Sequence, residues 1–107
     1  MADLTFKEFQ WVNARRCEAG FKSSVTDWNP LEWGGALAGE VGELCNLLKK
    51  ERRGEKIDPK KIADEIADVL TYLDLLATRC GVDVETALKS KFNRVSEKRG
   101  CPEIVLE

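Results

Sequence analysis

Two stretches decide the fold: residues 39–46, GEVGELCN, and residues 64–70, DEIADVL. Each stretch places two acidic residues three positions apart in an otherwise apolar helical pattern, namely Glu40 with Glu43 and Glu65 with Asp68. Residues three apart are neighbours on a helix surface, so each stretch presents two carboxylates side by side. Carboxylates beside an apolar face are costly unless something positive holds them. We therefore interpret the pairs as a divalent metal site between two antiparallel helices, with ordinary solvated acid pairs as the alternative.

Start and stop signals around these stretches divide the chain into four helices and a tail. We expect helices at about residues 5–19, 30–53, 59–80 and 84–99, followed by an extended tail at 101–107. Four N-cap residues begin the helices: Thr5, Asn29, Asp58 and Asp83. Thr5 with Glu8 forms a capping box, and the caps at 29 and 58 each precede a proline, which favours the first helical position. Four glycines end the helices: Gly20, Gly54, Gly81 and Gly100.

The apolar residues recur at helical spacing, and no strand pattern competes with them. The second helix carries one apolar stripe: Leu37, Val41, Leu44 and Leu48. Its short connection to the third helix makes these two helices antiparallel neighbours. We therefore predict an all-α, four-helix bundle-like domain spanning residues 1–107. Because a bundle of this size has a modest core, we expect it to oligomerise.

Composition excludes several classes of function. The chain has 107 residues, 43% of them hydrophobic and 34% charged, which is typical of one globular domain. Its net charge of −2 gives no broad basic surface, so we expect no stable nucleic-acid binding. No apolar run has membrane-spanning length and no leader-like segment opens the chain, so we expect no membrane partner and a cytoplasmic location.

The absence of histidine and the spacing of the cysteines restrict the kinds of catalytic or metal site that the chain can form. The chain has no histidine, which excludes a Ser-His-Asp nucleophile and a di-iron bundle of the Glu-x-x-His type. A metal held by the four acids would have only oxygen ligands, which favour Mg²⁺, Mn²⁺ or Ca²⁺ over zinc or copper. The four cysteines lack CxxC spacing, so we interpret them as small buried hydrophobes or reduced thiols.

Two further features of the second predicted helix can each be interpreted in two ways. Gly35, Gly39 and Gly42 each cost about 1 kcal/mol relative to alanine, which indicates a face approached closely by another backbone or a ligand. Ordinary packing between helices is the alternative. Residues 49–56, KKERRGEK, are either a solvated helix end or a positive rim that draws in an anionic substrate.

The order of these motifs resembles a known family. The two acid motifs, Tyr72 and the basic segment 91–100, KFNRVSEKRG, resemble the ExxE…ExxD signature of the MazG-like all-α NTP pyrophosphohydrolases. The resemblance covers roughly residues 28–100 and is closest to the small single-domain members of the dCTP pyrophosphatase type. Many members have a glutamate where this chain has Gly39, which leaves the number of metal ions open, and Asp64 adds an acid before the second motif.

The resemblance implies an activity and a set of site residues. Members cleave an NTP or dNTP to the NMP and pyrophosphate with Mg²⁺, for which Mn²⁺ substitutes, and they form homodimers or homotetramers. Four acids would hold Mg²⁺: Glu40, Glu43, Glu65 and Asp68. One of these four would orient the attacking water. Substrate would contact six further residues: Lys91, Asn93 and Arg94 at the phosphates, Tyr72 in the nucleotide pocket, and Trp28 or Trp33 stacked on the base. A hydrophobic staple is the alternative for the tryptophans, and a solvated helix face is the alternative for the two cations.

Two other functions compete with this one. A helical oligomer that binds a nucleotide or a protein without turnover would keep the fold but has no use for four converging carboxylates. An enzyme resembling phosphoribosyl-ATP pyrophosphohydrolase would share the chemistry, and nothing in the sequence selects that substrate.

Overall fold

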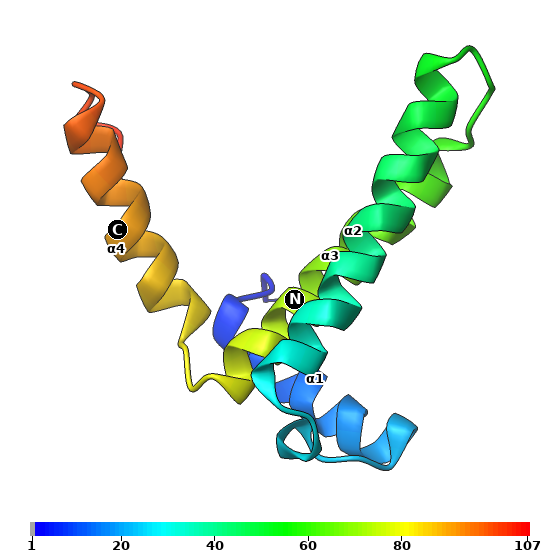
Figure 1. Cartoon of the computed structure of the whole chain (residues 1–107). Helices are drawn as coiled ribbons and strands as arrows, with labels where there is room; N and C mark the ends of the chain where they lie inside the picture. Colours follow the sequence, from blue (N-terminus) through cyan, green and yellow to red (C-terminus); the bar gives the residue numbers. More distant parts are fainter. Residues whose placement is uncertain (1) are drawn as a thin grey trace.

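A computed structural model describes residues 2–107; Met1, which we include in the predicted domain, lies outside the described residues. The described chain is entirely helical apart from its connections. The elements are α1 (Phe6–Phe21), the 3₁₀ turn η1 (Val25–Asp27), α2 (Pro30–Arg52), α3 (Pro59–Arg79) and α4 (Val84–Lys98) (Figure 1). The all-α class is confirmed, and the four predicted helices lie within two residues of the observed bounds.

The predicted caps begin the helices through local hydrogen bonds. The Asn29 side chain accepts a hydrogen bond from the Glu32 amide at 2.8 Å, while the Glu32 carboxylate accepts one from the Asn29 amide at 3.0 Å. Asp58 and Asp83 cap α3 and α4 by accepting from backbone amides in the first turn. Thr5 accepts from the Glu8 amide at 3.1 Å, so the structure shows the threonine half of that capping box.

The end of α1 differs from the prediction. The helix continues through Gly20 to Phe21, and Lys22 takes the left-handed conformation with a φ of 55°. Beside this end, the Cys17 thiol donates a hydrogen bond to the Ser23 carbonyl at 3.4 Å, so the chain after α1 lies back against the helix. The region predicted as a plain loop then forms η1, in which Ser24 and Asp27 make their own capping box.

The core lies where α1, η1, α2 and α3 meet. Its buried apolar residues are Cys17, Val25, Trp33 and Leu75. α2 and α3 pack along each other as the predicted hairpin, and α1 crosses α3 (Figure 1). Asn13 of α1 links these helices by donating to the Thr71 carbonyl at 3.0 Å and to the buried Asp74 carboxylate at 2.9 Å. Burial raises the pKa of Asp74, and the Asn13 hydrogen bond partly opposes that shift.

The four helices do not close into the predicted bundle within one chain. α4 packs mainly on α1 and diverges from the α2–α3 hairpin, which gives the chain a V shape (Figure 1). The radius of gyration is 16.4 Å, against about 13 Å for a compact domain of this length. The α3–α4 connection determines this angle, because the Gln10 side chain donates to the Val82 carbonyl at 3.1 Å and accepts from the Val84 amide at 3.2 Å.

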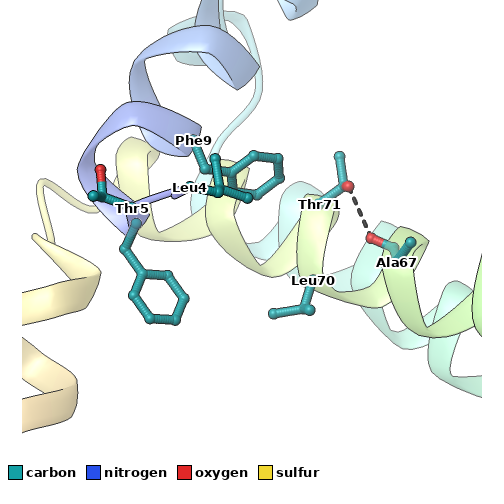
Figure 2. A pocket seen from close by; sticks show the side chains of 7 residues that line it. Leu4, Thr5, Phe9, Ala67, Leu70 and Thr71 are labelled. Carbon is teal, nitrogen blue, oxygen red and sulfur yellow. Dashed lines mark hydrogen bonds between the residues drawn. The ribbon is translucent and has the colours of Figure 1, made fainter. Parts of the chain in front are cut away.

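The open shape leaves apolar surface uncovered. An apolar groove of about 310 Å³ lies between the start of α1 and the middle of α3 (Figure 2). It is lined by apolar side chains and two threonines: Leu4, Thr5, Phe6, Phe9, Ala67, Leu70 and Thr71. A Cβ placed at Gly35, Gly39 or Gly42 would meet no atom of the described chain within 4 Å. Close packing within the chain is therefore the wrong explanation for these glycines.

The remaining predictions concern the cysteines and the tail. All four cysteines are free thiols, and Cys17 is buried as a small hydrophobe, as expected. The C-terminal segment is extended after a turn and is held on α4 by one side chain. The Asn93 amide donates to the Leu106 carbonyl at 2.9 Å and accepts from the Leu106 amide at 2.8 Å.

Candidate active site

An acidic cluster lies midway along the α2–α3 hairpin. Glu40 and Glu43 of α2 and Glu65 of α3 each offer a carboxylate oxygen, and these three oxygens lie within 4.8 Å of one another. The antiparallel packing brings the two acid motifs together, as the sequence predicts. Asp68 lies close enough for its charge to raise the pKa of both Glu40 and Glu65, although it is outside the group of three oxygens.

The mutual repulsion of the carboxylates in the cluster favours binding of a cation. Burial raises the pKa of Glu40 and of Glu65, and the neighbouring charges of Glu43 and Asp68 raise both further. One oxygen of Glu40 and one of Glu65 are buried without a hydrogen-bond partner, although both residues are only half-buried overall. Orphaned, mutually repelling carboxylate oxygens match the ligands of a hard divalent ion. The donor set therefore fits a divalent metal, which would neutralise the cluster and polarise a phosphoryl oxygen when bound.

An aromatic cavity of about 200 Å³ adjoins the same hairpin towards the start of α2. It is lined by aromatic, small and hydroxyl side chains: Cys17, Phe21, Ser23, Ser24, Trp28, Trp33, Tyr72 and Leu75. Tyr72 lies four residues after Asp68 and seven after Glu65 on α3, so the cavity begins about one helical turn from Asp68 and about two turns from the clustered oxygens. The structure thus brings Trp28, Trp33 and Tyr72 together beside the cluster.

The two tryptophans have different environments. Their ring centroids are 4.6 Å apart, which confirms the hydrophobic staple. The Trp33 ring is 5% exposed, donates from Nε1 to the Val25 carbonyl at 2.8 Å, and lies 6.3 Å from the Tyr72 ring. Trp28 is 41% exposed, and Arg79 fixes its backbone by donating to its carbonyl at 2.7 Å. Trp33 therefore belongs to the core and forms one wall of the cavity, whereas Trp28 is partly exposed.

The three predicted phosphate contacts on α4 lie away from the acids of the same chain. α4 diverges from the hairpin that carries the cluster (Figure 1). Arg94 donates to the Ser90 hydroxyl at 2.7 Å, and the Asn93 amide is occupied by the tail. Lys91 is exposed on the same helix. One chain by itself therefore does not assemble these residues with the clustered acids.

Some cavity residues escape sequence reasoning. Phe21 is the last residue of α1, and Ser23 and Ser24 lie in the connection between α1 and α2; all three line the cavity. An irregular segment has no periodicity from which to predict its contacts. Asp64, the extra acid before the second motif, is exposed and outside the clustered oxygens, and Gly39 leaves its position without a carboxylate.

Comparison with known proteins identifies the family of this chain. A sequence model of the MazG-like family matches residues 36–104, a span that contains both acid motifs, Tyr72 and the basic segment of α4. The chain belongs to the MazG-like family.

Individual relatives carry a more specific name. dCTP pyrophosphatase 1 of Homo sapiens is 39% identical over 90 residues, which cover 74% of this chain and 52% of that protein. The rat protein of the same name gives the same values, and the Bos taurus protein is 36% identical over 90 residues, covering 74% of this chain and 53% of its own. The chain spans about half the length of these curated relatives. Within residues 2–107, no helix combines the length and apolar character needed to cross a membrane.

Proposed function

We propose that this protein is a nucleotide pyrophosphohydrolase that uses Mg²⁺ to cleave an NTP or dNTP to the NMP and pyrophosphate. The observation that carries the proposal is the cluster of three carboxylates, with two orphaned oxygens, about two helical turns along the same hairpin from an aromatic cavity. Membership of the MazG-like family supports it, and the name of the relatives places dCTP among the substrates to test first. Such an activity would remove unwanted nucleotides from the cellular pool.

The chain's own residues account for the chemistry in this proposal. Glu40, Glu43, Glu65 and Asp68 would hold the Mg²⁺, which would neutralise phosphate charge and polarise the scissile phosphoryl group. Because there is no histidine, a carboxylate of the cluster would orient the attacking water and accept its proton. The base would enter the aromatic cavity and stack on the accessible ring of Trp28, since stacking suits any base face.

The direct test is pyrophosphate release over a panel of NTPs and dNTPs, with and without Mg²⁺. We expect turnover of at least one member, dependent on Mg²⁺ and retained with Mn²⁺. Phosphoribosyl-ATP belongs on the panel, because its exclusive turnover would favour the related enzyme. If no member is hydrolysed, the enzyme proposal fails and a binding oligomer without turnover becomes the better explanation.

We also propose that the working form is a homodimer or homotetramer, whose further copies cover the open faces. Two stripes at helical spacing remain exposed: Ile66, Leu70 and Leu73 on α3, and Leu88, Phe92 and Val95 on α4. Exposed apolar side chains gathered on a helix face, together with the groove of Figure 2, are the kind of surface that marks a protein–protein interface. A second copy supplies matching apolar stripes and a second α4, which would bring Lys91 and Arg94 to a site that one chain leaves incomplete.

Dilution tests the assembly. We expect light scattering to give a mass of two or four times 12.0 kDa, and we expect circular dichroism to show loss of helical structure together with dissociation at low concentration. Leu70→Glu, in the groove, should weaken assembly and activity together, because it buries a charge at the interface. Leu31→Glu is the matched control, since Leu31 is 83% exposed at the start of α2. A folded monomer in dilute solution would contradict this proposal.

A further inference from the structure

One face of α3 carries a linear series of side chains with different chemistry. Lys61, Glu65, Asp68 and Tyr72 follow one another at spacings of four, three and four residues, which places them on one stripe of the helix. With a rise of 1.5 Å per residue, Lys61 lies about 6 Å beyond Glu65 and about 16 Å from Tyr72 along the helix axis. The aromatic cavity is thus at one end, the acidic cluster in the middle, and a cation at the other end.

The fold gives no stabilising role to Lys61. It is exposed in the first turn of α3, three residues after the Asp58 cap, where the helix dipole disfavours positive charge. The ion pair found among residues 2–107 joins Arg53 with Glu55, so Lys61 is not paired with an acid of its own chain. A lysine four residues before a glutamate is also the weaker orientation for such a pair.

We propose that Lys61 binds the terminal phosphate of the nucleoside triphosphate, the group that leaves within pyrophosphate; this rests on the proposed function. A base in the aromatic cavity and a scissile phosphoryl group at the acids define a line, and Lys61 is the cation that continues it on the same stripe. All helical side chains lean towards the helix N-terminus, so the Lys61 ammonium lies beyond the Glu65 carboxylate along the stripe, on the side away from the cavity. The flexible lysine side chain can move to contact a phosphate group that is present only while substrate is bound.

The neighbouring Lys60 provides a matched control. It also lies in the first turn of α3 and is exposed, but it is about 100° around the helix from Lys61 and so off the stripe. Lys60→Gln and Lys61→Gln change the net charge equally and relieve the dipole equally. Any difference between the two variants therefore reports a local contact rather than long-range attraction of an anion.

The test measures inhibition by the two products, pyrophosphate and the NMP, alongside KM for the best triphosphate. For Lys61→Gln we expect KM and the inhibition constant of pyrophosphate to rise about tenfold, as for the loss of one charged hydrogen bond. The inhibition constant of the NMP should stay unchanged. Lys60→Gln should change all three constants less than about twofold, and Lys61→Arg should restore most of the pyrophosphate affinity. The melting temperature of Lys61→Gln should equal or exceed that of the wild type.

The outcomes separate this inference from the proposed function. If the wild type hydrolyses no nucleotide, the proposed function fails and the role of Lys61 fails with it. If the wild type is active but pyrophosphate inhibits Lys61→Gln and Lys60→Gln equally, the role of Lys61 alone is overturned. Equal weakening of NMP and pyrophosphate inhibition, or a lower melting temperature in Lys61→Gln, would show a general or structural role and would also overturn it.

Discussion

Glu43→Gln is expected to abolish hydrolysis while the helices stay folded. The change keeps the size of an exposed side chain on α2 but removes one of the three clustered carboxylates. Losing a metal ligand forfeits several kcal/mol of transition-state stabilisation, so kcat/KM should fall by about three orders of magnitude. Pyrophosphate release with the best substrate, together with circular dichroism of the variant, measures both parts of the expectation.

The same variant should behave differently without a divalent ion. The Glu43 charge raises the pKa of both Glu40 and Glu65, which means that it repels them in the folded state. Its removal should therefore raise the melting temperature of the metal-free protein, whereas Mg²⁺ should stabilise the wild type more than the variant. Glu51→Gln, the same exchange further along α2, should leave activity and Mg²⁺ stabilisation unchanged. Full activity in Glu43→Gln would refute its assignment as a ligand.

The second prediction with a large effect compares alanine substitutions of the two tryptophans. Trp33→Ala should lower the free energy of unfolding by about 3–5 kcal/mol, because it empties a core with few buried apolar residues and frees the Val25 carbonyl. Trp28→Ala should leave stability much closer to the wild type, because that ring is partly exposed. If Trp28 stacks on the base, the variant should lose about 1–3 kcal/mol of substrate binding, seen as a KM at least several-fold higher.

Denaturant unfolding and steady-state kinetics on both variants check this pair. Trp33→Phe is a useful intermediate, because it retains an aromatic ring in the core but lacks the Nε1 donor to Val25. Its loss of stability should be smaller than that of the alanine variant. An unchanged KM in Trp28→Ala would remove Trp28 from the substrate site, and an equal loss of stability in the two alanine variants would contradict the distinction between them.

The sequence by itself determined the features that depend on residues a few positions apart. The Asn29–Glu32 capping box and the Asp58 cap form as predicted, because both partners of each hydrogen bond lie within one turn. The two acid pairs meet because helical spacing fixes each pair, and a short connection forces α2 and α3 to be antiparallel. The staple between Trp28 and Trp33 follows from the same local geometry.

The tertiary structure decided what depends on contacts between distant segments. Gln10 holds the chain near residues 82–84 and so directs α4 away from the hairpin, which opens the predicted bundle and separates Lys91 from the acids. The connection between α1 and α2 contributes Ser23 and Ser24 to the aromatic cavity, beside Tyr72 and Leu75 of α3. Asn93, for which a phosphate contact is a prediction, holds the tail in this structure through two hydrogen bonds with Leu106. The periodicity of a sequence predicts which face of a helix is apolar, but it does not identify the segment that packs against that face. In this chain, much of the apolar surface of the helices remains exposed.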